Sequence, residues 1–240
     1  MQQHSKLALS LTGVILSSFA FLSTAHGQST KTPAKPILER IEWTDIWVTN
    51  ANADNELPRV LFVGDSITRG YFGRTEKNIG AKANCARYTT SAFISNPDYL
   101  AELKILLKRY HFDVIHINNG LHGWDYTEQQ YRDGFPALIQ LLKQYAPDAT
   151  IIWATTTPVR VRGNVQQLKQ DSTERVRMRN KIALEFAKKN HFLVSDLFAL
   201  VIDHPEYYNN GGVHFNAKGI AAQAKYIADI VSKALAARKK

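Results

Sequence analysis

The chain has 240 residues, of which 45% are hydrophobic and 21% are charged, as in an ordinary globular protein with one sizeable core. Its net charge of +9 suits an acidic partner such as an anionic polysaccharide, a cell-surface polymer or lipid headgroups. A basic surface that serves solubility alone explains the charge equally well. No nucleic-acid-binding motif is recognisable, so nucleic acid is not an expected partner. Cys85 is the only cysteine, which excludes an intramolecular disulfide, and we expect it to be a small buried hydrophobic residue.

The first 27 residues have the pattern of a secretory signal peptide. Lys6 gives a short basic start, residues 7–23 form an apolar core, and Ala25 and Gly27 are the small residues of a cleavage site. We therefore expect cleavage after Gly27 and a secreted or periplasmic protein with no stable membrane anchor. An uncleaved anchor is the alternative, but the flanks and the apolar length fit cleavage better. No later segment approaches transmembrane length.

Residues 28–57 are expected to be an exposed lead-in, whose Trp-containing segment IEWTDIWV packs on a domain formed by residues 58–240. In that domain, apolar strand-like runs alternate with amphipathic helical segments. Thr127 and Gln130 form a capping-box pattern, and Pro136 predicts a kink or a late start in the helix that follows. The expected strands are 59–64, 83–89, 112–118, 150–156 and 192–197, and the expected helices are 98–110, 128–145, 172–190 and 217–237.

The strand-like runs predict a parallel sheet that is covered on both faces. VLFVG and TIIWA are apolar at successive positions, as expected for strands with helices on both sides. The βαβα order then gives a three-layer α/β/α sandwich whose central sheet is mostly parallel and has five strands. Because sites in such sheets form at the carboxyl ends of the strands, we expect the chemistry there.

The first of these strands ends in Gly64, Asp65 and Ser66, where the chain turns polar. A glycine allows a tight turn, and a serine at the start of the next helix places its hydroxyl beside backbone N–H groups that can stabilise an oxyanion. Ser66 is then either a nucleophile or the cap of the helix, which is a common role for serine. The local motif does not separate these two interpretations.

A polar cluster follows the third strand. Asn118, Asn119, His122 and Asp125 lie within eight residues at its end. Side-chain amides and imidazoles are suitable donors to an oxyanion, so the cluster favours a functional role. A turn rich in Asn, Gly and Asp is the plain alternative.

His214 lies in a glycine-rich loop, NNGGVHFNAKG, before the last helix. A general base in such a loop can reach a serine on another strand. No histidine or acid spacing resembles a metal site, so neither a metal nor another cofactor is expected. After the fourth strand, Arg160 and Arg162 are candidates to meet an anionic substrate, although solvated arginines are the commoner outcome.

Taken together, these segments resemble the SGNH, or GDSL-type, serine hydrolases. The resemblance is carried by GDSIT at 64–68 and GGVHFNAKG at 211–219, and FDVIHINNGLHG at 112–123 is similar to the family's central block. It covers nearly the whole chain after the lead-in and implies a flavodoxin-like SGNH hydrolase fold. By that resemblance Ser66 is the nucleophile, its own N–H is an oxyanion donor, and His214 is the base. The implied reaction is hydrolysis of a small ester through an acyl-serine intermediate.

The chain departs from the family pattern beside its histidine. The family carries an acid three residues before the histidine, and here that position is Gly211. His214 then works either in a dyad or with another acid, Asp203 or Glu206. Loss of an orienting acid can reduce the rate of a triad by orders of magnitude.

The oxyanion groups depart from the pattern as well. His122 stands where the family's oxyanion asparagine would be and is expected to donate in its place, with Asn118 or Asn119 as alternatives. Asp65, beside the nucleophile, is a supporting residue. The oxyanion glycine of the family's second block has no clear counterpart, and a backbone N–H near it can still serve. The residues in that region are Thr89, Thr90 and Ser91.

The leading hypothesis is an exported serine esterase that removes acetyl or similar small acyl groups from a polysaccharide. Trp124 and Tyr126 are suited to stack on a sugar ring, although packing explains them equally well. A carbohydrate O-acyltransferase and a lipid-directed esterase are alternative enzymes. A non-catalytic glycan-binding protein with a decayed site is the alternative outside the enzymes.

Overall fold

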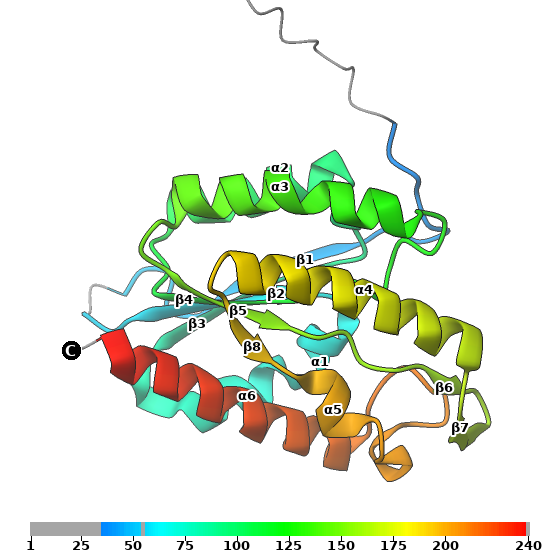
Figure 1. Cartoon of the computed structure of the whole chain (residues 1–240). Coiled ribbons are helices and arrows are strands. Elements are labelled where there is room, and N and C mark those ends of the chain that lie inside the picture. The colour runs from blue at the N-terminus through cyan, green and yellow to red at the C-terminus, as the bar shows by residue number, and fades with distance from the viewer. Residues whose placement is uncertain (1–34, 54–55, 239–240) are drawn as a thin grey trace, which may run out of the picture. The chain divides into compact units, whose positions relative to one another are not determined.

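A six-stranded sheet forms the centre of the fold in the computed structural model, which describes residues 35–53 and 56–238 (Figure 1). The strand order is β1-β3-β2-β4-β5-β8, and every neighbouring pair is parallel except β1 with β3, which is antiparallel. The predicted signal peptide lies outside the described residues. The strands are β1 Thr44–Val48, β2 Arg59–Gly64, β3 Asn84–Thr90, β4 Val114–Ile117, β5 Thr150–Ala154 and β8 Leu193–Ser195.

Helices cover both faces of the sheet and so form three layers (Figure 1). α2, α3 and α4 lie on one face, and α1, α5 and α6 lie on the other, where α1 packs against α6. The mostly parallel three-layer α/β fold is thereby confirmed. The helices are α1 Ser66–Ile79, α2 Pro97–Arg109, α3 Glu128–Tyr145, α4 Gln170–Lys189, α5 Leu197–Val201 and α6 Ala217–Arg238. A hairpin of β6 Arg160–Val161 and β7 Asn164–Leu168 follows β5, and the 3₁₀ turns are η1 Gly80–Lys82 and η2 Pro205–Tyr207.

The inner strands form because their residues are buried alternately on the two faces. In β2, Leu61 and Val63 pack into the apolar cluster that α2, α3 and α4 complete. Val60 and Phe62 pack into the opposite cluster, with α1 and α6. Burial of each such side chain contributes about 1.5–3 kcal/mol. Cys85 in β3 is buried as predicted, and burial raises the pKa of its thiol to about 12.

The sheet has one strand more than the five predicted. β1 lies in the segment that was expected only to pack on the domain, and it pairs with β3 along its whole length. As an edge strand it stays partly exposed, and the side chains of Ile46 and Trp47 face solvent. Its sequence therefore lacks the buried apolar run that identifies the inner strands.

α3 begins with the predicted capping box. Thr127 Oγ1 accepts a hydrogen bond from the Gln130 N–H at 3.1 Å, and Gln130 Oε1 accepts one from the Thr127 N–H at 2.8 Å. The helix runs on through Pro136 to Tyr145, so the expectation of a late start is wrong. The buried apolar face of α3 outweighs the one helical hydrogen bond that proline removes.

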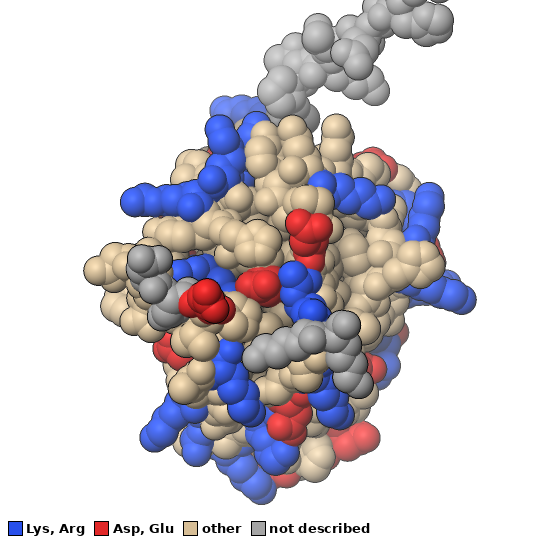
Figure 2. Space-filling view, turned by 90° about the vertical axis from the view of Figure 1, so that its left-hand side faces the viewer, with Lys and Arg blue, Asp and Glu red and all other residues tan. Residues whose placement is uncertain are grey.

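Charged side chains are distributed over the surface. On the face shown in Figure 2, Lys and Arg lie in several separate groups, with acidic side chains between them. The excess of positive charge is therefore not gathered into one patch on that face. No helix within the described ranges is long and apolar enough to cross a membrane.

Candidate active site

Ser66 is the first residue of α1, and a single residue, Asp65, separates it from the end of β2 at Gly64. Asp65 caps this helix, because its Oδ1 accepts a hydrogen bond from the Ile67 N–H at 2.8 Å. Since the cap is Asp65, the Ser66 hydroxyl is available to another partner. The Ser66 N–H belongs to the first turn of the helix, where N–H groups lack helical acceptors and can bind an anion.

The partner of the Ser66 hydroxyl is His214, from the loop before α6. Ser66 Oγ and His214 Nε2 are 2.8 Å apart, although 148 positions separate the two residues in the chain. The packing of α1 against α6 brings the two segments together (Figure 1). A hydroxyl and an imidazole at this distance are placed for His214 to accept the Ser66 proton.

Backbone contacts fix the loop that carries His214. Gly212 has a positive φ of 77°, and a Cβ there would lie 2.3 Å from the Arg160 carbonyl oxygen, so this position requires glycine. The Gly212 carbonyl accepts from the Arg160 N–H at 2.7 Å, and the His214 carbonyl accepts from the Asn209 N–H at 2.9 Å. Arg160, a predicted candidate for substrate contact, is therefore buried and supports this loop.

The second ring nitrogen of His214, Nδ1, has no carboxylate partner within residues 35–53 and 56–238. Glu206, one of the two acids considered, accepts a hydrogen bond from His204 Nδ1 at 2.9 Å and lies 3.6 Å from Lys218 Nζ. The other acid, Asp203, makes no hydrogen bond to His214 in the described part of the chain. The geometry is therefore that of a Ser–His dyad.

Ser66 and His214 line a cleft of about 310 Å³ at the carboxyl edge of the sheet. His122 and Trp124 line the same cleft from the segment after β4. Lys169, which precedes α4, adds an exposed cation to its lining. The volume is at the lower end of the range for small-molecule sites.

The two asparagines after β4 do not line this cleft. Asn118 Nδ2 donates to the Ala154 carbonyl at 2.8 Å, and Asn119 Nδ2 donates to the Ala92 carbonyl at 3.0 Å. Both side chains are buried and connect neighbouring strand ends within the fold. Of the predicted side-chain donors to an oxyanion, His122 is the one that the structure brings to Ser66.

The residues considered in place of the missing glycine bind the N-terminal segment. Thr90 Oγ1 donates to the Trp43 carbonyl at 3.0 Å, and Ser91 Oγ donates to Glu42 Oε2 at 2.5 Å. Thr89, one position earlier, is buried in β3. This region therefore holds the segment before β1 against the sheet, and it supplies no side chain to the cleft.

Two side chains that the sequence did not reveal hold the loop of His122. Arg179 of α4 is fully buried and donates to the carbonyls of Gly120, His122 and Gly123 at 2.9, 2.7 and 2.8 Å. Glu39, from the N-terminal segment, accepts from His122 Nδ1 at 2.9 Å and from the Gly123 N–H at 2.8 Å. The position of His122 is thus set by α4 and by the N-terminal segment.

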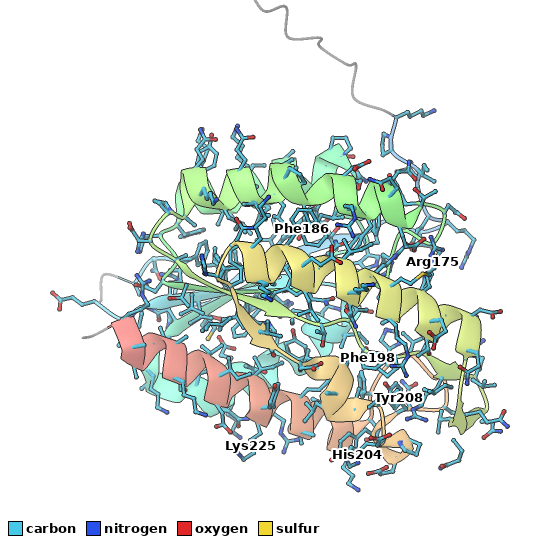
Figure 3. The ribbon with its side chains drawn as sticks, viewed as in Figure 1. Arg175, Phe186, Phe198, His204, Tyr208 and Lys225 are labelled. Atoms are coloured by element: carbon cyan, nitrogen blue, oxygen red, sulfur yellow. The ribbon has the colours of Figure 1, made fainter. Side chains whose placement is uncertain are left out.

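Arg175, one turn before Arg179 on α4, supports the next part of the same loop (Figure 3). Its guanidinium donates to the carbonyls of Trp124 and Tyr126 and pairs with Glu128 at 2.6 Å. It also lies over the Trp124 ring, 5.4 Å from the ring centroid. These contacts keep the indole at the cleft.

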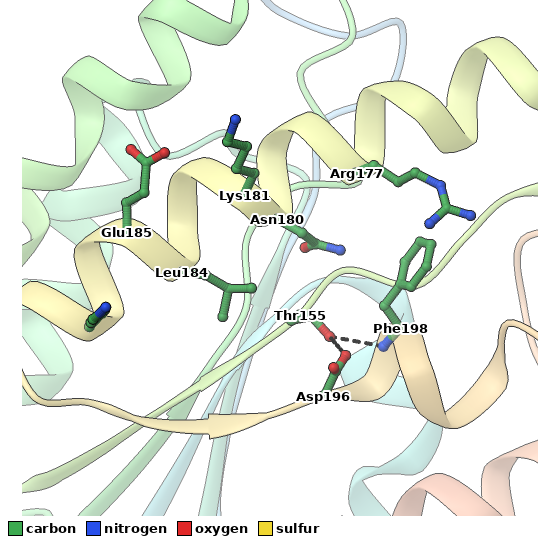
Figure 4. Close-up of a pocket in the computed structure, with 9 residues that line it drawn as sticks. Thr155, Arg177, Asn180, Lys181, Leu184, Glu185, Asp196 and Phe198 are labelled. Carbon is green, nitrogen blue, oxygen red and sulfur yellow. Dashed lines mark hydrogen bonds between the residues drawn. The ribbon is translucent and has the colours of Figure 1, made fainter.

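A larger hollow of about 550 Å³ is lined by residues of α4 and α5 (Figure 4). The Thr155 hydroxyl there donates to Asp196 Oδ1 at 2.9 Å and accepts from the Phe198 N–H at 2.8 Å. These bonds connect the end of β5 to the start of α5 and give Thr155 a structural role. Neither Ser66 nor His214 lines this hollow.

A serine hydrogen-bonded to a histidine at the carboxyl edge of a parallel sheet is the arrangement of a serine hydrolase. The model of the GDSL-like lipase/acylhydrolase family matches residues 62–222, and the chain belongs to this family. The protein is an ester-bond hydrolase. No group of three His, Cys, Asp or Glu side chains in the described part of the chain is placed to hold a metal ion.

Several solved structures have the same fold. A carbohydrate acetylesterase from Sinorhizobium meliloti, Est24, is similar with a TM-score of 0.61 and 13% identity, over 73% of this chain and 99% of that one. An aryl esterase from M. smegmatis has a TM-score of 0.62 and 13% identity with the same shares covered. A protein described as a putative platelet activating factor from Streptococcus pneumonia has a TM-score of 0.60 and 21% identity, over 75% of this chain and 87% of that one. No curated protein matches the chain.

Proposed function

We propose that the protein is an exported esterase that removes acetyl or similar small acyl groups from a polysaccharide, with Ser66 as nucleophile and His214 as base. The observation that carries the proposal is the 2.8 Å contact between Ser66 Oγ and His214 Nε2 at the edge of the sheet. The reaction follows from this contact. His214 Nε2 takes the Ser66 proton while Oγ attacks the ester carbonyl carbon, and a tetrahedral oxyanion forms.

The oxyanion collapses when the bond to the alcohol breaks. His214 returns its proton to the departing alkoxide, and the acyl group stays on Ser66 Oγ as an ester. Water then loses a proton to His214 and attacks the same carbonyl carbon. The second oxyanion expels Ser66 Oγ, which recovers its proton, and the carboxylic acid leaves. Water is the one co-reactant that these steps consume, and no atom changes its oxidation state.

Two donors are available for the oxyanion. The Ser66 N–H lies in the first turn of α1, where the helix dipole places a partial positive charge at the N-terminus of the helix. The imidazole of His122 lines the same cleft, and we expect it to donate where the family has an asparagine. Donors of this kind stabilise the transition state by about 2.7–4 kcal/mol each.

The lining of the cleft supports a small acyl group on a sugar. Its volume of about 310 Å³ leaves room for a short acyl chain beside one sugar ring, on which the Trp124 indole can stack. Lys169 places a cation at the cleft and favours a polymer with acidic groups. Est24, which shares the fold, is described as a carbohydrate acetylesterase. Export is supported by the signal-peptide pattern of residues 1–27.

The test is a screen of the purified mature protein against acetylated and methyl-esterified glycans, with released acid and retained polymer both measured. We expect acetate release by the wild-type protein and a loss of at least about 10³-fold in kcat for Ser66→Ala. Equal rates for the two proteins would contradict the mechanism. Transfer of the acyl group to an added acceptor glycan, with no free acid released, would identify an O-acyltransferase. A preference for long-chain esters would identify a lipid-directed esterase.

Because His214 lacks an acid partner within the described residues, the reactivity of Ser66 is the part of the mechanism that needs a direct test. Labelling by a fluorophosphonate, with loss of the label in Ser66→Ala, supports the esterase. A folded protein that binds acetylated glycan but is never labelled at Ser66 would contradict the proposed role of Ser66 as nucleophile. Amino-terminal sequencing of the protein recovered outside the cytoplasm tests export and is expected to begin at Gln28.

A further inference from the structure

His122 is held by a carboxylate that comes from outside the catalytic segments. Glu39 Oε2 accepts from His122 Nδ1 at 2.9 Å, and its other oxygen, Oε1, accepts from the Gly123 N–H at 2.8 Å. Both the imidazole and the carboxylate are mostly buried, with 21% and 27% of their side-chain surface exposed. A carboxylate that binds with both oxygens to one loop fixes the direction of the ring as well as its position.

The segment that carries Glu39 is itself anchored to the sheet. The Glu39 N–H donates to Glu42 Oε1 at 2.6 Å, and Glu42 Oε2 accepts from Ser91 Oγ at 2.5 Å. The Trp43 N–H donates to the same Ser91 hydroxyl at 2.9 Å, and the Ile37 N–H donates to Tyr126 Oη at 2.8 Å. Contacts on both sides of Glu39 therefore hold its carboxylate against the His122 loop.

With Nδ1 bonded to Glu39, Nε2 is the ring nitrogen of His122 that remains for a substrate, since it makes no hydrogen bond within the described residues. Two protonation states place a proton on Nδ1. The neutral form leaves a lone pair on Nε2, which would repel an oxyanion, whereas the imidazolium has an N–H on both nitrogens. A donor to the oxyanion therefore requires the imidazolium.

We propose that Glu39 is a positioning residue that keeps His122 protonated at both nitrogens and directs its Nε2–H to the oxyanion formed at Ser66. The proposal rests on the esterase function and adds a cationic donor in place of the family's neutral asparagine. It also gives the lead-in before β1 a part in catalysis, because this segment delivers the carboxylate.

The charges around the ring agree with this state. Burial by itself would lower the pKa of His122, but the hydrogen bond to Glu39 and the negative charges of Asp65, Glu39 and Glu42 outweigh it, so that the pKa lies above its ordinary value. The pKa of Glu39 is lowered, because its bonds to His122 and Gly123 outweigh the effect of burial.

Groups from every neighbouring element face this ring. Glu39, Glu42 and the Trp43 ring belong to the N-terminal segment, and Asp65 caps α1. The cations nearby are Arg179, which bonds the His122 carbonyl, and Lys169, while His214 lines the same cleft.

Activity falls towards alkaline pH as His122 loses the proton that makes Nε2 a donor, and this loss gives the pH profile a falling limb. Removal of the negative charge at Glu39 lowers the pKa of His122, so the falling limb moves to lower pH.

The test compares Glu39→Gln in the mature protein with the same change in a His122→Asn background. In the wild-type background we expect kcat to fall on the order of 10- to 100-fold at alkaline pH, with KM little changed and the falling limb at lower pH. Asparagine donates without titrating, so His122→Asn should have no falling limb from position 122. In the His122→Asn background, Glu39→Gln should lower kcat by less than about 2-fold.

Two results overturn the proposal: an equal loss of kcat from Glu39→Gln in both backgrounds, which marks a structural role, or an unmoved falling limb. A titration of the His122 ring protons by NMR separates this proposal from the function on which it rests. If Glu39→Gln lowers the pKa of His122 but no ester is hydrolysed, the esterase function fails and the ion pair stands. If esters are hydrolysed and the pKa of His122 does not move, the proposal fails and the esterase stands.

Discussion

Two adjacent glycines before His214 differ in the room they leave for a side chain: Gly211 has space for a Cβ, and Gly212 does not. Gly212→Ala introduces a Cβ at a φ of 77°, which costs about 1–2 kcal/mol in the left-handed region. The same Cβ lies 2.3 Å from the Arg160 carbonyl oxygen and 2.8 Å from its carbonyl carbon. Arg160 is buried, and its guanidinium donates to the Val165 carbonyl at 2.9 Å, so the loop must move instead.

The movement reaches His214, which is the proposed base. His214 is two residues further on, and its 2.8 Å contact with Ser66 does not survive a shift of roughly 1 Å, which typically costs about 10²-fold in rate. We expect Gly212→Ala to lower kcat for p-nitrophenyl acetate by about 10²-fold and the free energy of unfolding by about 2 kcal/mol.

Gly211→Ala is the matched control. Gly211 has no positive φ, and the nearest atom to its added Cβ is the Asn209 side-chain oxygen at 3.1 Å, so a shift of a few tenths of an ångström accommodates it. Its kcat is expected to stay within about 3-fold of wild type. Steady-state kinetics and urea unfolding of the three proteins provide both quantities. A Gly212→Ala protein with the kcat of the Gly211→Ala control would refute the argument that the Arg160 backbone sets the position of His214.

Two further predictions concern acid stability and substrate charge. Both ring nitrogens of His116 are buried and have no hydrogen-bond partner in the described part of the chain, and burial lowers the pKa of His116 to about 3. Because the unfolded chain binds this proton below about pH 6.5 and the folded one does not, the free energy of unfolding should fall by up to about 1.4 kcal/mol per pH unit between about pH 6.5 and 3. His116→Leu should reduce that slope in urea titrations, and an unchanged slope would contradict the assignment. Lys169→Gln should raise KM several-fold for acetylated acidic glycans and leave KM for neutral glycans unchanged. An equal change of KM for acidic and neutral glycans would show that Lys169 does not recognise the charge of the substrate.

The central sheet could be predicted because its inner strands carry their information locally. Val60 to Val63 are buried on alternate faces, so the run is apolar at successive positions and indicates a covered parallel strand. β1 carries no such signal, because Ile46 and Trp47 remain exposed at the edge of the sheet. Its place is set by pairing with a strand about forty residues away, which periodicity does not encode.

Only the site residues that stand in short local motifs could be predicted from the sequence. Ser66 and His214 each stand in a short recognisable block, and the structure places them 2.8 Å apart. Glu39 lies 83 positions from His122 in a polar lead-in, where an isolated carboxylate has no distinguishing signal. Asn118 and Asn119 resembled donors because of their position at a strand end, but amides there also satisfy the backbone groups of neighbouring strands.

The dyad explains how the site tolerates glycine at position 211. An orienting acid holds the imidazole in one direction, and in this chain the fixed backbone of the loop does part of that work. The His214 carbonyl is bonded to the Asn209 N–H, and the Asn216 side chain accepts from the N–H groups of Lys218 and Gly219 at the start of α6. The cost is the lost electrostatic stabilisation of the imidazolium, which a cationic donor at His122 does not replace.

Capture of the acyl-enzyme would show directly whether Ser66 is the nucleophile. The mature protein is mixed with p-nitrophenyl acetate, quenched in acid within one turnover, digested and analysed by mass spectrometry. We expect one acetyl group on the peptide that contains Ser66. The group should accumulate in a His214→Ala protein only at a greatly reduced rate, and it should be absent from Ser66→Ala. Ester hydrolysis at the wild-type rate by Ser66→Ala, or an acetyl group found on another residue at the turnover rate, would contradict this expectation.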